Sequence, residues 1–104
     1  MKFYHPFIKQ FHIKFDLTIW ENEKLVWLNN FIIPEKYRRN RIGTVIMEEF
    51  CKWLDENKMN SKLLISNCYG TPEDILIKFY SRFNYNIEEK KTKNIYMIRN
   101  FTND

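Results

Sequence analysis

The chain has 104 residues, of which 44% are apolar, 17% aromatic and 29% charged. This length suits one domain, so we expect residues 1–104 to fold as a single domain. The aromatic content argues against a disordered chain, and the formal net charge of +4 is compatible with an anionic ligand or an acidic partner.

Two further features bear on the compartment. No apolar run approaches the roughly 18 residues that a membrane span requires, and residues 1–10 lack the uninterrupted apolar core of a signal peptide. Cys51 and Cys68 stand outside any Cys-x-x-Cys motif and have no histidine cluster nearby. We therefore expect buried free thiols, no metal site, no membrane partner and a cytoplasmic location.

The first third of the chain predicts strands. Residues 1–8 are expected to form a short edge strand, because Pro6 would not suit a central one. Apolar and polar residues alternate over residues 11–20, the pattern of a half-buried strand. A second apolar run, residues 25–33, follows an acidic turn and stops at a proline, so the two runs predict a hairpin.

The period then changes. From Ile42 the apolar residues fall at helical spacing, which predicts an amphipathic helix that ends near residues 57–60. Residues 62–66 are short and apolar, as in a buried strand. Thr71 and Pro72 predict the next helix start, with threonine as N-cap and proline as the first helical residue.

Residues 85–89 and 94–101 predict a closing hairpin. The predicted order is strand, strand, strand, helix, strand, helix, strand, strand. This order indicates a mixed α/β layer architecture without repeats or linkers.

A basic loop, residues 34–44, joins a buried strand to the start of a helix. Free amides of a first helical turn, the helix dipole and guanidinium groups together favour an anion, and a phosphate in particular. Gly43, one of only two glycines, stands where a phosphate would approach the backbone. The alternative is a basic loop that is simply solvated.

This loop resembles the pyrophosphate loop of the GNAT superfamily of N-acetyltransferases, whose pattern is [Gln/Arg]-x-x-Gly-x-[Gly/Ala]. The residues that carry the resemblance are Pro34, Tyr37, Arg38, Ile42, Gly43 and Thr44. A second family block, Phe-Tyr-x-x-x-Gly-Phe, is matched by Phe79-Tyr80-Ser81-Arg82-Phe83-Asn84-Tyr85. The resemblance covers about residues 25–101. It implies an α/β (α+β) fold with a GNAT-like mixed, mostly antiparallel sheet and two main helices, lacking the usual N-terminal helix pair.

The resemblance also implies a site. Acetyl-CoA would be the cosubstrate, and Tyr80 would be the catalytic proton donor to the thiolate leaving group, although a tyrosine on an apolar helix face can equally be a core residue. The cofactor-binding residues that the resemblance implies are Phe31, Ile32, Ile33, Arg38, Arg39, Asn40, Arg41, Ile42, Gly43 and Thr44.

Three residues depart from the family pattern. Arg41 stands where the first motif glycine is usual, Arg39 occupies a position that is often glycine, and Asn84 replaces the glycine of the second block. Asparagine tolerates a positive φ, so Asn84 fits. Arg41 must adopt a compatible backbone or open the loop.

The catalytic base is not evident. The family's strand glutamate falls near Val26, and Asp16, Glu21 and Glu23 are remote candidates. Asn29 could instead orient a water molecule.

The resemblance predicts an acetyl-CoA-dependent N-acetyltransferase in which an amine attacks the thioester directly. The residues before Pro34 read as strands and leave no room for the helices that usually wall the acceptor groove. An open groove favours a protein lysine or other macromolecular amine. The composition also indicates low-GC coding, which is compatible with the compact members of this family found in phages.

The sequence leaves two other functional hypotheses open. The first is a catalytically weak GNAT-fold module that binds a protein partner, for example a phage anti-defence or anti-CRISPR protein. The second, a nucleic-acid binder, is disfavoured because basic and aromatic residues are not interleaved on one face. The oligomeric state is not predicted.

Overall fold

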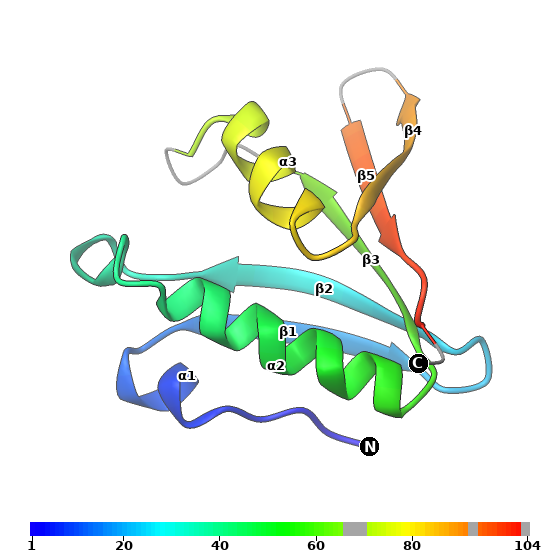
Figure 1. Ribbon diagram of the computed structural model, residues 1–104, viewed down its shortest axis with the longest axis horizontal. Coiled ribbons are helices and arrows are strands. Elements are labelled where there is room, and N and C mark those ends of the chain that lie inside the picture. The colour runs from blue at the N-terminus through cyan, green and yellow to red at the C-terminus, as the bar shows by residue number, and fades with distance from the viewer. Residues whose placement is uncertain (66–70, 92–93, 103–104) are drawn as a thin grey trace.

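The computed structural model describes residues 1–65, 71–91 and 94–102, and Cys68 lies outside them. Along the chain, a β-hairpin precedes a central helix–strand–helix segment and a second β-hairpin follows it (Figure 1). In chain order the elements are α1 (Pro6–Gln10), β1 (Lys14–Trp20), β2 (Leu25–Ile32), the short 3-10 helix η1 (Glu35–Tyr37), α2 (Ile42–Glu56), β3 (Asn60–Ile65), α3 (Glu73–Ser81), β4 (Asn86–Lys91) and β5 (Asn94–Arg99).

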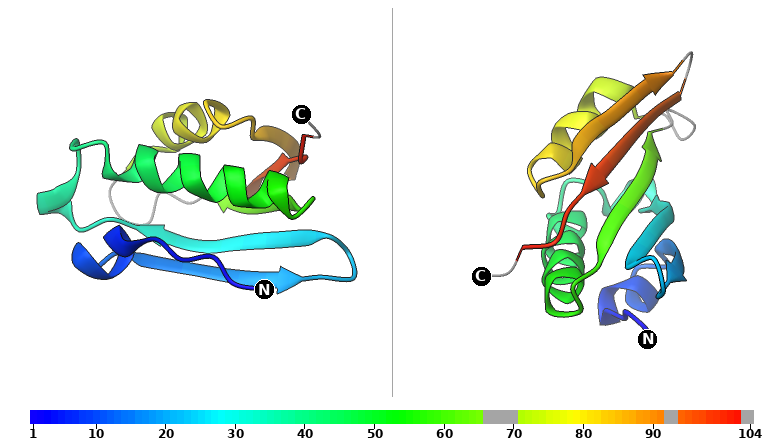
Figure 2. Two further views of the ribbon diagram at one scale, coloured as in Figure 1. Left: turned by 60° about the horizontal axis from the view of Figure 1, so that its bottom comes forward. Right: turned by 90° about the vertical axis from the view of Figure 1, so that its right-hand side faces the viewer.

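The strands form one five-stranded sheet in the order β1-β2-β3-β5-β4. Only β2 and β3 run parallel, and the other neighbours are antiparallel. The two long helices, α2 and α3, pack on the same face of the sheet (Figure 2). The prediction of a mixed, mostly antiparallel sheet with two main helices is confirmed.

Both predicted hairpins are present. β1 alternates half-buried and exposed residues along its whole length, and it pairs with β2 from Lys14–Ile32 to Trp20–Leu25. β4 pairs with β5 in the same antiparallel way. The alternation that predicted the first hairpin gives β1 one apolar face, and this face packs against α2.

The predicted strand over residues 1–8 is wrong, because residues 6–10 form α1 instead. The ring Nδ1 of His5 accepts a hydrogen bond from the Phe7 N–H at 3.1 Å and so caps the helix. Pro6 takes the first helical position, where its fixed φ is favourable and its missing N–H costs nothing. Phe3 anchors the preceding segment against Phe15 of β1.

The helix over residues 42–56 begins and ends as predicted. Its buried side chains are Ile42, Ile46, Met47, Phe50, Cys51 and Leu54. Cys51 is a free, buried thiol, as expected. Within the described residues, no helix is long and apolar enough to cross a membrane.

The start of α3 lies one residue later than predicted. Thr71 is not the N-cap; Pro72 holds that position, with φ −59° and ψ 149°, and no side-chain cap accompanies it. The carbonyl of Pro72 accepts the first helical hydrogen bond, from the Leu76 N–H at 3.1 Å. Glu73 and Asp74 then place negative charge in the first turn, where the helix dipole favours it.

An ion pair between a buried guanidinium and a half-buried carboxylate ties the end of α2 to the end of β5. Arg99 is only 4% exposed, and its two terminal nitrogens donate to the two carboxylate oxygens of Asp55 at 2.8 and 3.0 Å. Its Nε donates to the carbonyl of Phe83 at 2.8 Å, and Asp55 also accepts from the Thr102 N–H. The guanidinium therefore holds α2, the turn after α3 and the last strand together.

We expect Asp55→Asn to lower the free energy of unfolding by about 3 kcal/mol at neutral pH, because it leaves the Arg99 guanidinium buried without its countercharge. The hydrogen bond from Arg99 lowers the pKa of the Asp55 carboxyl below its ordinary 3.8 in the folded state. The carboxylate's contribution is therefore present above pH 3.8 and is lost as the pH falls through the lower, folded-state pKa.

Urea unfolding of both proteins at neutral and at acid pH measures this difference. The difference in the free energy of unfolding between the parent and Asp55→Asn should become smaller at acid pH. Glu49→Gln, an exposed change on the same helix, should stay within about 0.5 kcal/mol of the parent. A gap that does not depend on pH would contradict the assigned role of the Asp55 charge.

Candidate functional site

The site begins where two neighbouring strands part. β2 and β3 pair only from Leu25–Asn60 to Leu28–Leu63, although β2 continues to Ile32 and β3 to Ile65. Beyond Leu28 the two strands diverge, so the backbone of residues 29–32 faces a gap on the side where β3 would otherwise pair. Asn29 and Asn30 instead bond their amide side chains to β1, through Thr18 Oγ1 at 2.6 Å and Asp16 Oδ2 at 3.1 Å.

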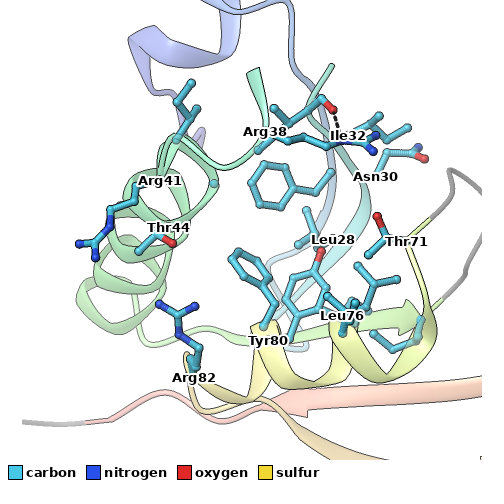
Figure 3. Close-up of a pocket in the computed structure, with 18 of the residues that line it drawn as sticks. Leu28, Asn30, Ile32, Arg38, Arg41, Thr44, Thr71, Leu76, Tyr80 and Arg82 are labelled. Carbon is cyan, nitrogen blue, oxygen red and sulfur yellow. Dashed lines mark hydrogen bonds between the residues drawn. The ribbon is translucent and has the colours of Figure 1, made fainter. Parts of the chain in front are cut away.

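A cavity of about 900 Å³ occupies this gap (Figure 3). It lies between β2, β3, the start of α2 and one face of α3. Its lining residues are Leu28, Asn29, Asn30, Phe31, Ile32, Ile33, Tyr37, Arg38, Arg39, Arg41, Ile42, Gly43, Thr44, Glu48, Leu63, Leu64, Ile65, Thr71, Ile75, Leu76, Phe79, Tyr80 and Arg82. Its size is within the usual range for small-molecule sites.

The loop from β2 to α2 folds back on the strand that it leaves. The Nε of Arg38 donates a hydrogen bond to the carbonyl of Ile33 at 2.9 Å, so this side chain turns toward the strand end (Figure 3). Arg39 and Arg41 have φ values of 69° and 61°, in the left-handed region that glycine favours. Arg41 therefore adopts the backbone compatible with the loop, at a cost of roughly 1–2 kcal/mol for a residue with a side chain.

The first turn of α2 presents amide groups to the cavity. The first bond into the helix runs from the Val45 N–H to the Arg41 carbonyl at 3.0 Å, so the amides of residues 42–44 precede the intrahelical ladder. No side chain of a described residue caps this end. A left-handed residue followed by a helical one, as at Arg41 and Ile42, turns consecutive N–H groups into an anion-binding concavity.

Gly43 lets three elements meet at this end of the cavity. A Cβ atom at this position would lie 3.0 Å from Ile33 Cδ1 and 3.6 Å from Phe79 Cζ. The close approach therefore involves the end of β2 and one face of α3, and it brings the helix start against both. The sequence assigned the glycine to a close ligand, whereas the structure shows a packing reason as well.

Tyr80 lies on the cavity wall at the point where the strands part. Its side chain is 8% exposed, and its ring packs against those of Phe79 and Tyr85 at centroid distances of 5.2 and 5.7 Å. Figure 3 shows its hydroxyl directed toward Leu28 of β2. Burial raises the pKa of Tyr80 above its ordinary value of 10, so the phenol is protonated at neutral pH and can donate a proton.

The described residues hold no group of three or more histidine, cysteine or acidic side chains that could bind a metal ion. The arrangement is thus an anion-binding helix start at one end of an apolar cavity, with a buried phenol near the other. No protein-family model matches the sequence, and no curated protein sequence matches it significantly. Comparison of the fold is more informative.

Several solved structures share this architecture. The PaiA N-acetyltransferase from Thermoplasma acidophilum, in complex with coenzyme A, has a TM-score of 0.66 and 15% identity over 84% of this chain and 52% of its own. Naa50 from Arabidopsis thaliana, in complex with the bisubstrate analogue CoA-Ac-MVNAL, has a TM-score of 0.60 and 18% identity over 83% and 61%. A GNAT-family protein from Bacteroides thetaiotaomicron has a TM-score of 0.62 and 18% identity over 83% and 54%.

This chain has the GNAT fold. The resemblance to the GNAT superfamily is thus confirmed for the fold. The chain spans only about half to three-fifths of the length of these neighbours. The left-handed Arg39 and Arg41 stand at loop positions where the GNAT pattern has or allows glycine. Asn84, in place of the second-block glycine, also has a positive φ of 69°.

The cavity brings together almost all of the site residues that the sequence predicted. Tyr80, the strand end and the loop all line it, with the exception of Asn40, which is exposed and outside the lining. The lining residues from the predicted set are Phe31, Ile32, Ile33, Arg38, Arg39, Arg41, Ile42, Gly43, Thr44 and Tyr80.

The candidate bases are placed less favourably. Val26 is fully buried in the core, and Glu21 lies in the β1–β2 turn, 3.8 Å from the N-terminal amine. Glu23 is exposed in the same turn. Asp16 touches the site only through Asn30, whereas Asn29 lines the cavity itself.

Sequence reasoning missed two charged residues of the lining, Glu48 and Arg82. Glu48 follows Thr44 by one helical turn, so the periodicity of α2 places both on one face. Arg82 follows Tyr80 by two residues at the end of α3. The helical spacing in the sequence could have placed Glu48 beside Thr44. No sequence pattern could have placed Arg82 there, because that depends on how α3 packs near α2.

Tyr80 should resist ionisation in the folded protein. We expect the phenolate absorbance of the protein and of Tyr80→Phe to agree up to about pH 10, where a solvated tyrosine is half ionised, because burial keeps this phenol neutral. In urea the same comparison should show one additional titrating phenol in the parent. A difference already present near pH 10 in the folded state would show that Tyr80 is not buried as described.

Proposed function

We propose that this protein is an acetyl-CoA-dependent N-acetyltransferase. The observation that carries the proposal is the divergence of β2 and β3, which opens one cavity between an anion-binding helix start and the hydroxyl of Tyr80. An acyl thioester of a nucleotide needs such a pair of ends, one for its pyrophosphate and one for its reacting carbon. The CoA complex of the Thermoplasma acidophilum neighbour supports this assignment.

The chain offers a matching surface for each part of acetyl-CoA. The amides of residues 42–44 and the guanidinium groups of Arg39 and Arg41 would hold the pyrophosphate, with the helix dipole adding to the attraction. The strand edge of residues 29–32, which does not pair with β3, would bond the amides of the pantetheine arm. The acetyl group would then lie near Tyr80.

The transfer step needs one proton at the sulfur. The amine nitrogen attacks the thioester carbonyl, the new C–N bond forms, and the C–S bond breaks to release a thiolate. Tyr80 donates its proton to that sulfur and recovers one from water afterwards. Because burial keeps the phenol protonated at neutral pH, the donor is in the correct state before the reaction starts.

The amine must also lose a proton. Among the described lining residues, the only carboxylate is that of Glu48, which belongs to α2 and not to the strand end. Asn29 is part of the lining on β2, and its amide is held by Thr18 at 2.6 Å. We infer that Asn29 orients a water molecule which takes the proton from the amine.

The acceptor class that we propose is a protein lysine or another macromolecular amine. Among the described residues, the strand end of the cavity is lined by neutral groups such as Asn29, Asn30 and Thr71, and not by the acidic cluster that a small polyamine would need. Neutral amides suit hydrogen bonding to a peptide backbone. The Naa50 neighbour was captured with an analogue that joins CoA to a peptide, which supports this choice.

The test is a matched pair of tyrosine variants. Tyr80→Phe should lower kcat by about 100-fold or more while the Kd for acetyl-CoA stays within about twofold, because only the proton donor is removed. The measurement is thiol release with a library of lysine peptides as acceptors, combined with calorimetry of acetyl-CoA binding. Tyr96→Phe, on the sheet face away from the helices, should leave both values unchanged.

Two outcomes would count against the proposal. If acetyl-CoA does not bind at millimolar concentration, the enzymatic function is wrong, and the protein-binding module becomes the better reading. If acetyl-CoA binds and Tyr80→Phe retains full activity, the transferase stands but its proton donor is another group.

A further inference from the structure

The main cavity has two charged side chains at its rim that the transfer reaction does not use, Glu48 and Arg82. Arg41, Thr44 and Glu48 line it from α2, and Arg82 lines it from the end of α3. Figure 3 shows the guanidinium of Arg82 directed toward the start of α2, where Arg41 and Thr44 lie. Glu48 and Arg82 also border a neighbouring hollow, so they stand at the rim of the main cavity.

The direction of the ligand follows from the two ends. The pyrophosphate of CoA would sit at the start of α2, and the pantetheine arm would run from there toward Tyr80. The adenosine part of CoA would extend from the pyrophosphate in the direction opposite to the pantetheine arm, toward the rim. CoA carries a phosphate monoester on its ribose 3′ oxygen, and such a group has a charge of about −1.5 to −2 at neutral pH.

The rim can receive that charge. Arg82 contributes a guanidinium group there, and Glu48 contributes one carboxylate. Guanidinium is the side chain best suited to phosphate, since its planar set of donors can bond two oxygens at once. The carboxylate of Glu48 would repel a phosphate, and it would accept hydrogen bonds from the neutral hydroxyl and amino groups of a nucleoside.

The backbone position of Arg82 is well defined. The residue ends α3, and its N–H donates to the Phe79 carbonyl at 3.2 Å. The following turn closes through the Phe83 N–H to the Tyr80 carbonyl at 2.9 Å and the left-handed Asn84. The same short segment therefore positions the catalytic phenol inside the cavity and a guanidinium at its rim.

We propose that Arg82 binds the 3′-phosphate of CoA and makes the protein select CoA over 3′-dephospho-CoA. This specificity rests on the proposed acetyl-CoA-dependent function. It assigns to Arg82 a binding role separate from the pyrophosphate loop and from the transfer of the acetyl group.

The experiment is calorimetric titration of the full chain with CoA and with 3′-dephospho-CoA. The protein should bind CoA about tenfold more tightly, the effect of one charge-assisted phosphate contact. Arg82→Gln should reduce this ratio to about twofold by weakening CoA alone, because dephospho-CoA keeps its pyrophosphate but has no 3′-phosphate to lose. Thermal unfolding checks that the variant is folded.

Two further variants sharpen the result. Lys78→Gln removes an exposed positive charge from the same helix but outside the cavity lining, and it should leave the ratio unchanged. Glu48→Gln removes the opposing charge and should raise the ratio.

The outcomes separate the two proposals. Equal binding of both ligands by the protein, or a ratio that Arg82→Gln does not change, would overturn the role of Arg82 and leave the transferase intact. A ratio lowered equally by Lys78→Gln would show a general charge effect and would also overturn it. If neither ligand binds, the proposed function fails, and the specificity fails with it.

Discussion

The divergence of β2 from β3 is the constraint on which the site depends. Two parallel neighbours that paired along their full lengths would leave no cavity between them. Here the ladder stops at Leu28 and Leu63. β2 continues with Asn29 and Asn30, whose side-chain amides donate hydrogen bonds to side chains of β1. The sheet thus remains one unit through β1 on one side and β5 on the other. The gap in its middle is the candidate binding site, and the strand pairing on both sides of it belongs to the fold itself.

The start of α2 gives this gap the features of a candidate anion site. Gly43 admits the end of β2 and a face of α3 within van der Waals contact, and two arginines accept a left-handed backbone just before it. Non-glycine residues in that region are strained, and the strain persists only where the surroundings hold it. The hydrogen bond from Arg38 to Ile33 holds the loop against the strand, and the amides of residues 42–44 remain outside the intrahelical ladder at the helix start.

The second half of the fold places the phenol. Arg99 joins Asp55 of α2 to the turn that follows α3, and Tyr85 bonds Ser61 of β3 through its hydroxyl at 2.7 Å. These buried polar groups lie on both sides of the short segment that carries Tyr80 and Arg82. Loss of either set of contacts would shift the end of α3, and with it the proposed proton donor and the proposed phosphate contact.

Local patterns in the sequence determined much of this protein: the alternation of β1, the helical stripe of α2, and the basic loop with its glycine. Each is a statement about neighbouring residues, so it could be read without knowing what lies across the fold. The N-terminal segment was misread because a proline suits both an edge strand and a first helical turn, and a histidine cap decided between them. Only the tertiary structure showed where β2 and β3 part, that Arg41 has a left-handed backbone, and that Arg82 lines the same cavity as the start of α2. These features depend on contacts between residues distant in the chain, which periodicity does not encode.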